Sequence, residues 1–463
     1  MSWVNVVIAM LPENFLLVGI VMLVVLEAAG SLRGRAALVV PLLAVGFAAA
    51  AALWLSALGY DAVAFSGHYS VDPTALIAKA IVLGLALPTL LVSSREAAER
   101  AFGVLLLSSL YGACLLLSAD SFLTLFLGLE LMSLPVYALI LVAFRRAESA
   151  EGALKYLVLG GAATATLLMG VSLLYGWSGS MALSVFAKAI GSSDAIAIAG
   201  VVLVLLAFLL KAAVVPFHTW APDAYEGATI PVTAYMATIV KAAVLLAAVR
   251  LFGAAPVGRP MADLLAILPL ASIVWGNLTA MRQESFRRMI GYSSIAHAGY
   301  LFYAFLGEGD GRFQAVAFYV LAYGLMNLLA FASLPRGGDG VPEDRLDNLR
   351  GLFRREPYAA IAIGVAMLSL AGIPPLPGFV AKFLIFKNVF AAGFTVYAVL
   401  GLVGSYLGIY FYLRVIQYLF MSAEEAGGAG ARAPARLALG ASLICLLAAL
   451  LIGVFPGWVI DRL

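Results

Sequence analysis

Long apolar stretches recur along the chain and constrain its fold more than any other feature. Each approaches the ~20 residues that an α-helix needs to cross the hydrocarbon core of a bilayer. On this criterion we count about fourteen candidate helices, centred near residues 22, 47, 83, 109, 132, 164, 205, 241, 270, 297, 323, 370, 407 and 445. The sequence therefore predicts an all-α polytopic membrane protein.

Composition supports this fold class and leaves little room for another domain. Of the 463 residues, 64% are hydrophobic and 11% are charged, whereas soluble domains contain ~25% charged residues. The polar interruptions are short, and they cover residues 61–72, 177–194, 253–262, 306–313, 335–356 and 422–437. We therefore expect any redox or nucleotide-binding domain to belong to a partner chain.

Basic residues in the connections indicate orientation, because cytoplasmic loops are enriched in Lys and Arg. The connections after odd-numbered helices contain Arg33, Arg35, Arg95, Arg100, Arg145, Arg146, Arg282, Arg287, Arg288, Arg336, Arg345, Arg350, Arg354, Arg355, Arg432 and Arg436. Those after even-numbered helices contain Lys188, Arg259 and Arg312, with Arg250 and Lys387 at their edges. We therefore expect the odd connections in the cytoplasm and both termini outside.

The first apolar stretch and the net charge each exclude a simple alternative. The stretch lacks a preceding basic region and carries Glu13 instead, so we expect a retained span rather than a cleaved signal peptide. The net charge of +3 reflects loop arginines and does not indicate a nucleic-acid partner.

Several charged residues lie inside the apolar stretches: Glu130, Lys155, Lys211, Lys241 and Lys382. Placing a charge at the centre of a membrane helix costs about 2.5–3.5 kcal/mol on insertion scales. Such residues are kept for ion conduction, ion pairing or binding, and we take these as the candidate functional residues.

Two of the predicted helices, the seventh and the twelfth, are interrupted. The seventh runs through Lys211 to Pro216 and continues as the polar segment FHTWAPDAYEGATIP, whereas the twelfth is broken by the glycines and prolines of residues 372–378. Broken spans are tolerated only where the freed backbone groups are buried in protein or face water. Comparable breaks in two helices predict a repeat and its ion pathway.

The breaks divide the chain into four predicted segments. These are a three-helix segment (1–99), a first repeat of helices 4–8 (100–252), a second repeat of helices 9–13 (253–421), and a linker with helix 14 (422–463). Each repeat holds an odd number of spans, so the second must begin at the opposite membrane face. We therefore predict two inverted five-helix repeats whose broken helices open toward opposite compartments.

Glu130 in the fifth helix is expected to pair with Lys211 at the break of the seventh. A nearby carboxylate stabilises the ammonium form of a lysine, while burial opposes it. Movement of Glu130 would then switch Lys211 between binding and releasing a proton. The alternative is a structural ion pair between two helices.

The other lysines differ in their freedom to reach water. Lys241 lies at the centre of its stretch without a route to the interface, which favours a functional role. Lys382 follows the second break and is predicted to be the terminal proton site of the second repeat, with Lys387 as an interfacial anchor. Lys155 lies near the cytoplasmic end of the sixth helix, where its long side chain can instead reach the interface.

Two histidines lie between the lysine positions. His218 follows the first break, and His297 lies within GYSSIAHAGYLFY beside Ser293 and Ser294. This polar company favours a proton relay, although a histidine in a helical bundle is also commonly a packing residue.

Other polar residues receive a simpler interpretation. His68 lies in an outer connection with Tyr69 and is expected to be solvated. Lys79 in the third helix and Glu27 in the first lie outside both predicted repeats, and we interpret them as interface or snorkelling residues.

The sequence contains no recognisable motif for a redox cluster, a metal site or a phosphate-binding site. Cys114 and Cys445 stand alone in apolar stretches, without the CxxC spacing of clusters. No HExxH or clustered Cys/His spacing occurs, and no glycine-rich loop carries a phosphate-binding lysine.

Long motifs resemble a known family. The motifs are FLGLELMSLPVYALI (126–140), LLKAAVVPFHTWAPDAYEGATIPVTAYMATIVKAA (209–243), RMIGYSSIAHAGY (288–300) and SLAGIPPLPGFVAKF (369–383). They resemble the antiporter-like proton-translocating membrane subunits of respiratory NADH:quinone oxidoreductase, complex I. The resemblance extends over nearly the whole chain.

This resemblance implies roles for the candidate residues, position by position. It implies an ion pair of Glu130 with Lys211, a central proton site at Lys241, a terminal one at Lys382, and links that include His218 and His297, with Lys155 matching a basic residue of the sixth span.

The resemblance also implies cofactors and partners. No cofactor or metal is expected in this chain, whereas the complex would use NADH, FMN, iron-sulfur clusters and quinone in other subunits. The expected neighbours are the antiporter-like subunit M, the small subunits J and K, and lipid of the bacterial inner membrane.

Alternative functions stay open at this point. A subunit of a multi-subunit sodium/proton antiporter would transport ions without NADH or quinone. A ferredoxin- or hydrogenase-driven complex would use another electron donor. A structural scaffold would tolerate neutral, volume-matched replacements of its lysines.

Overall fold

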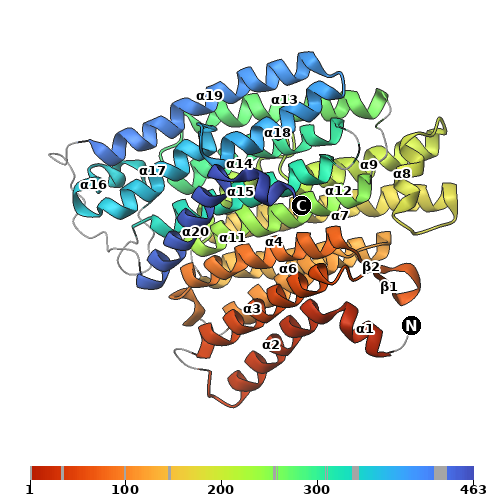
Figure 1. The fold of residues 1–463 in the computed structure, drawn as a ribbon, viewed down its shortest axis with the longest axis horizontal. Coiled ribbons are helices and arrows are strands. Elements are labelled where there is room, and N and C mark those ends of the chain that lie inside the picture. Colours follow the sequence, from red (N-terminus) through yellow and green to blue (C-terminus); the bar gives the residue numbers. More distant parts are fainter. Residues whose placement is uncertain are drawn as a thin grey trace.

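The fold is an all-helical bundle with one short β-hairpin (Figure 1). The computed structural model describes residues 3–32, 36–98, 101–143, 147–253, 257, 259–307, 309, 311–335, 344–421 and 435–463. Most of the predicted linker, and several of the loop arginines used to predict orientation, lie outside these ranges.

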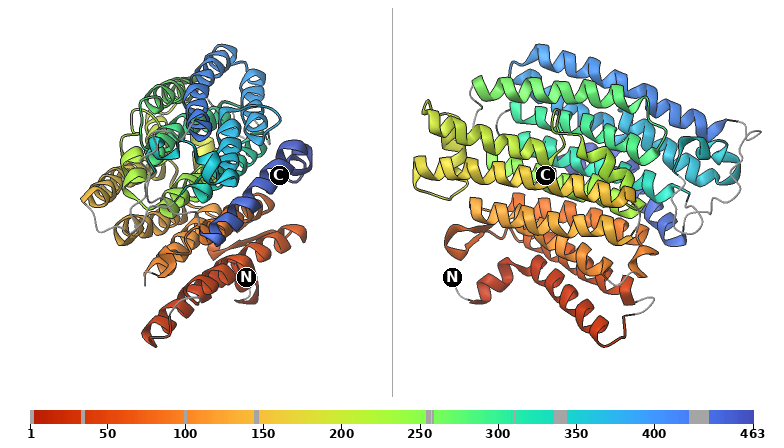
Figure 2. Two further views of the ribbon diagram at one scale, coloured as in Figure 1. Left: turned by 90° about the vertical axis from the view of Figure 1, so that its left-hand side faces the viewer. Right: turned by 180° about the vertical axis from the view of Figure 1, so that it is seen from behind.

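The first part of the chain forms one edge of the bundle (Figures 1 and 2). Its elements are α1 (Trp3–Ala9), α2 (Leu11–Ala28), α3 (Ala36–Ala57), β1 (Ala62–Ala64), η1 (Phe65–Gly67), β2 (Tyr69–Val71), α4 (Pro73–Val92) and η2 (Glu96–Ala98). β1 and β2 pair antiparallel, with Ala62 opposite Val71. The Asp72 side chain caps α4 by accepting from the backbone N–H of Ala75.

The next part runs inward from α5 to the centre of the bundle. It comprises α5 (Phe102–Leu117), α6 (Phe122–Ala143), α7 (Ala147–Ser178), α8 (Ser184–Ile190), α9 (Ala195–Lys211), α10 (Trp220–Gly227), α11 (Ile230–Tyr235), the π-helical turn η3 (Met236–Val240) and α12 (Lys241–Phe252). α8 and α9 meet at 117°. α11, η3 and α12 form one span that is buried throughout.

The last part packs around that central span and reaches the opposite edge, where α13 and α19 lie (Figure 1). It comprises α13 (Arg259–Ala280), α14 (Phe286–Tyr303), η4 (Ala304–Leu306), α15 (Gly311–Ser333), η6 (Leu346–Leu349), α16 (Leu352–Arg355), α17 (Pro357–Ala371), α18 (Pro377–Ala391), α19 (Thr395–Phe420), α20 (Arg436–Val454) and α21 (Pro456–Ile460). α15 is nearly as buried as α12, whereas α2 is largely exposed.

The polytopic prediction is confirmed at the level of the fold class. Among the described residues, ten helices are long and apolar enough to cross a membrane, or eleven if the bent pair α8–α9 is one span. Every predicted centre falls in a separate helix, but α5 and α17 are shorter apolar helices. The count of fourteen spans therefore stays a prediction.

Both predicted helix breaks coincide with interruptions in the structure. α9 ends at Lys211, and α17 ends before Gly372, whose φ is +89°. The freed backbone groups find partners: the Val215 N–H donates to Ser272 Oγ at 2.7 Å, and the Gly378 N–H to Ser369 Oγ at 3.1 Å. These bonds explain how irregular backbone survives inside the bundle.

Candidate functional site

Glu130 and Lys211 form the ion pair that the sequence predicts. Lys211 Nζ lies 3.3 Å from Glu130 Oε1 and 3.4 Å from Ser133 Oγ. Thr164 Oγ1 donates to the same carboxylate oxygen at 2.5 Å. The lysine side chain is 4% exposed and the glutamate side chain 22%. Because α9 ends at Lys211, the pair combines a buried charge with a helix terminus.

Lys241 begins α12 directly after the π-helical turn η3. Its Nζ donates to the backbone carbonyl of Ser294 on α14 at 2.7 Å. The residue is buried, and no carboxylate pairs with it in the part of the chain that the structure describes. A π turn inside an α-helix frequently marks a functional position, and no sequence pattern predicted this one.

His297 lies one turn along α14 from Ser294 and contacts two tyrosine hydroxyls. Nδ1 is 2.8 Å from Tyr319 Oη, and Nε2 is 3.1 Å from Tyr412 Oη. Tyr412 Oη also lies 2.5 Å from Ser293 Oγ. The imidazole is thus enclosed by groups that both donate and accept hydrogen bonds, as a proton relay requires.

Lys382 occupies the second break. Its Nζ donates to the Ala371 carbonyl and to Ser405 Oγ, each at 3.0 Å, and lies 5.1 Å from the ring centre of Tyr300. The lysine also lines a cavity of about 480 Å³ between α18 and α19, together with Lys387. The carbonyl freed at the end of α17 is therefore a ligand of the ammonium group.

One face of α14 joins these sites. Ser294, His297 and Tyr300 follow at intervals of three residues, so each lies beside the next and the three together spread over about 120° of the helix surface. The Tyr300 ring is 5.5 Å from that of His297 and lies beside Lys382. Lys241, His297 and Lys382 thus form one buried row, and no direct hydrogen bond within the described residues connects it to Lys211.

Lys155 lies outside this row. Its side chain is 42% exposed and forms ion pairs of 2.6 Å with Glu151 and with Asp223. Asp223 and Glu226 also pair with Arg288. Lys155 is therefore part of a partly exposed charge network over α7, α10 and α14.

His218 is likewise separate from the lysines in the described structure. Its Nδ1 lies 3.3 Å from the carbonyl of Pro216, and its ring contacts that of Trp275 edge-on at 6.3 Å. It is partly exposed beside the first break.

The sequence interpretation of Lys79 as an interface or snorkelling residue was wrong. Lys79 does not reach an interface: its Nζ lies 2.6 Å from Glu13 Oε1, and both side chains are 0% exposed. Tyr69, which is buried, donates its hydroxyl to the same carboxylate oxygen at 2.7 Å. Opposite charges in the first and third apolar stretches were the signal that could have suggested this pair.

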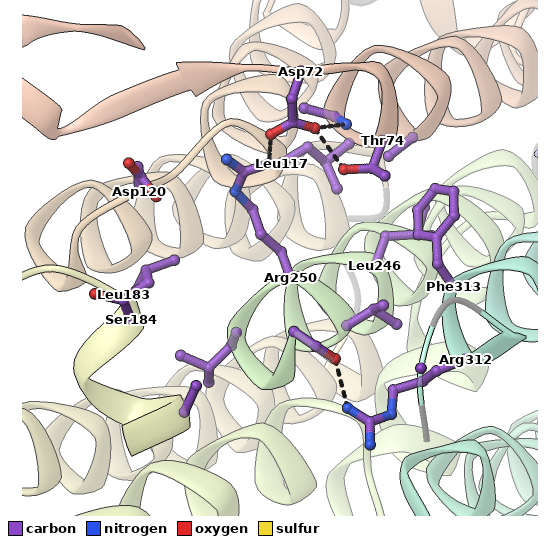
Figure 3. A pocket seen from close by; sticks show the side chains of 17 residues that line it. Asp72, Thr74, Leu117, Asp120, Leu183, Ser184, Leu246, Arg250, Arg312 and Phe313 are labelled. Atoms are coloured by element: carbon purple, nitrogen blue, oxygen red, sulfur yellow. Dashed lines mark hydrogen bonds and ion pairs between the residues drawn. The ribbon is translucent and has the colours of Figure 1, made fainter. Parts of the chain in front are cut away.

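A cavity of about 460 Å³ lies where α4 begins and α12 ends (Figure 3). Arg250 Nη1 lies 2.6 Å from Asp72 Oδ2, and Arg312 lines the same cavity. Burial alone would raise the pKa of Asp72, but the charge of Arg250 and several hydrogen bonds hold it below its ordinary value. Burial outweighs Arg250 at Asp120 and raises that pKa.

Comparisons with known proteins identify the family of this chain. Residues 119–408 match the family described as NADH:quinone oxidoreductase/Mrp antiporter, TM. A Pelobacter propionicus protein named NADH-quinone oxidoreductase subunit N is 40% identical over 90% of this chain and 89% of its own length.

Solved structures show the same fold. A chain of respiratory complex I from Thermus thermophilus, solved with bound aureothin, is 36% identical, with a TM-score of 0.84 over 97% of this chain and 98% of that one. A chain of the Mrp complex from a Dietzia species reaches a TM-score of 0.86 over 98% of this chain and 96% of its own, at 22% identity.

The fold and the family match define an antiporter-like, proton-translocating membrane subunit. Its relatives are subunits of an enzyme complex, NADH-quinone oxidoreductase. The chain belongs to the subunit N family of that complex, as GLELMSLPVYAL and WAPDAYEG also suggest.

Proposed function

We propose that this chain transfers protons along Lys241, His297 and Lys382 and that the Glu130–Lys211 pair controls the occupancy of this row. The observation that carries the proposal is the shared face of α14, which contacts both lysines and holds the histidine between them. Charged residues inside a membrane bundle commonly mark such proton relays.

Electrostatics supplies the means of control. Approach of Glu130 to Lys211 stabilises the ammonium form, and its withdrawal favours release of the proton. Coupled sites titrate together, so a change in one charge alters the proton affinity of the next. Moving one proton against 100 mV requires about 2.3 kcal/mol, which must come from quinone reduction elsewhere in the complex.

The proposed topology follows from the sequence. The chain crosses the bacterial inner membrane fourteen times, with both termini outside and the two five-helix repeats of residues 100–252 and 253–421 inverted. Residues 1–99 form a separate three-helix segment, and residues 422–463 form the linker and last helix. Well-partnered breaks in α9–α10 and α17–α18 support a pathway at each.

The proposed role assigns the redox chemistry to other subunits. NADH, FMN, iron-sulfur clusters and quinone are bound there, and subunits M, J and K are the membrane neighbours. Among the described residues, no group of three His, Cys, Asp or Glu side chains is placed to hold a metal ion.

The proposal is tested in the assembled complex in inverted membrane vesicles. Lys211→Ala and Glu130→Ala are expected to lose most quinone-reductase-coupled proton uptake per assembled complex. Lys188→Ala, which changes an exposed lysine on α8, serves as the control. Full coupled uptake in Lys211→Ala and Glu130→Ala would exclude the proposed role of the pair, and sodium-dependent uptake without NADH would favour the antiporter alternative.

His218 and Lys155 have less structural support as members of the proposed proton pathway than the other candidate residues. Neither contacts the row on α14 within the described residues. We keep His218 as a relay beside the first break and Lys155 as a charge near the entrance, where water can complete the connection.

A further inference from the structure

A second buried carboxylate and lysine pair lies outside both proposed repeats. Glu13 is in the first turn of α2, and Lys79 is in the second turn of α4. Lys79 Nζ is 2.6 Å from Glu13 Oε1 and 2.8 Å from Tyr69 Oη, and the tyrosine hydroxyl donates to Glu13 at 2.7 Å. The three polar groups form a closed triangle with both charges at 0% exposure.

Only one of the two oxygens of the Glu13 carboxylate has a described hydrogen-bond partner. Both contacts fall on Oε1, and no described residue donates a hydrogen bond to Oε2, which is buried. An unpartnered buried acceptor is unfavourable, and a well-packed apolar pair is often as stable as a buried ion pair. Helix packing alone therefore does not account for this pair, whereas a carboxylate that takes up a proton needs an oxygen of this kind.

The triangle has the same components as the Glu130–Lys211 site. Each combines a carboxylate from one helix, a lysine from another and a hydroxyl within reach of the lysine, Tyr69 in one and Ser133 in the other. The Glu13 site is the more enclosed, since the Glu130 side chain is 22% exposed.

The β-hairpin links the triangle to the central span. Tyr69 begins β2, and three residues later Asp72 forms the ion pair with Arg250 (Figure 3). Arg250 lies on α12, the helix that begins with Lys241. A change in the triangle that moves β2 therefore reaches the Lys241 helix through a second ion pair.

The geometry points to Glu13, Lys79 and Tyr69 as a further proton-transfer site of the pump, a conclusion that rests on the proposed function. Glu13 takes up a proton at Oε2 from a hydronium ion, which is left as water, and becomes a neutral carboxylic acid, while Lys79 keeps its ammonium charge. Release of the proton restores the ion pair. No electron moves, and no bond changes other than O–H.

The test uses the assembled complex in inverted vesicles, with activity expressed per complex on native gels. Glu13→Gln keeps the shape of the side chain but cannot take up the proton. We expect it to lose most coupled proton uptake. We also expect it to lose a carbonyl band of protonated carboxylic acid from infrared difference spectra between resting and turning-over enzyme, a signal that a purely structural pair does not produce.

A matched control separates this role from packing. Asp344→Asn disrupts another buried ion pair, in which Asp344 lies 2.8 Å from Arg287 with side chains 7% and 6% exposed. We expect this variant to lower only the amount of assembled complex. Full uptake and an unchanged carbonyl band in Glu13→Gln would overturn the proposal.

Tyr69→Phe decides the question if Glu13→Gln does not assemble. It removes the hydroxyl but keeps the ring and both charges. We expect a shifted carbonyl band and slower uptake, and the absence of both effects would overturn the proposal. Lys211→Ala is measured in parallel: loss of uptake there with none in the Glu13 and Tyr69 variants refutes only this further site, whereas full uptake in Lys211→Ala refutes the proposed function itself.

Discussion

Gly378 offers a direct test of whether the second helix break positions Lys382. Gly378 is the second residue of α18 and packs against Ser369 in the last turn of α17. Its N–H donates to Ser369 Oγ. A Cβ added at position 378 would lie 1.8 Å from the Ser369 carbonyl oxygen. That oxygen is backbone and cannot rotate away, so Gly378→Ala must push α18 from α17.

The size of this displacement follows from the contact distance. Real Cβ atoms essentially never approach other atoms more closely than 3.0 Å, so the helices must separate by about 1.2 Å. Lys382 lies one turn further along α18, and its bond to the Ala371 carbonyl at the end of α17 is 3.0 Å long. An added 1.2 Å exceeds the hydrogen-bond range. Misplacement of a reacting group by 1 Å can reduce a rate about 100-fold, so we expect coupled proton uptake to fall about 10- to 100-fold.

The assay compares Gly378→Ala with Gly364→Ala in the assembled complex. Gly364 lies within α17, and nothing stands within 4 Å of an added Cβ there, so that control should keep normal uptake. Assembled Gly378→Ala complex with normal coupled uptake would refute the claim that close α17–α18 packing positions Lys382.

Three other tests, which use four substitutions, address separate parts of the structure. Lys155→Met should change turnover little, because partly exposed ion pairs contribute about 0–1 kcal/mol; a loss as large as that of Lys211→Ala would contradict this. His297→Ala should reduce coupled uptake far more than His218→Ala, since only His297 contacts the row on α14; equal losses in uptake assays would contradict it. Asp72→Asn should lower complex stability by about 1 kcal/mol, between the values for exposed and buried pairs. Because the charge of Arg250 and several hydrogen bonds lower the pKa of Asp72, its carboxylate is ionised at pH 6 and at pH 8, so the effect of Asp72→Asn on the inactivation temperature of the complex should be the same at both.

The sequence predicts most of what local chemistry determines. Proline removes a backbone donor and glycine permits positive φ, so the breaks beside Lys211 and Lys382 are readable in the chain itself. The Glu130–Lys211 pair was also predictable, because an isolated carboxylate in one apolar helix needs a cation in another.

Other features depend on contacts between distant segments. The Glu13–Lys79–Tyr69 triangle joins two helices and a hairpin, and the hairpin looked like an ordinary solvated connection in the sequence. His218 and His297 were similar candidates by position, but tertiary packing gives only His297 its tyrosine partners. For Lys155 the sequence left open whether its long side chain reaches the interface, and only the fold shows that it lies near enough to the bundle surface to meet Asp223.

The π-helical turn η3 has a consequence for the register of the central span. An α-helix advances by about 100° per residue, so one extra residue accommodated in a wide turn rotates everything after it by about that angle. The preceding turns keep Tyr235 on Ser109 of α5, while the following turns direct Lys241 to α14 and Arg250 to Asp72. Deleting one residue from η3 would leave a helix of nearly the same length and composition. The residues of α12 that follow η3 would then be rotated away from α14 and Asp72. The direction of Lys241 is therefore encoded as a single-residue phase shift within an otherwise continuous helix.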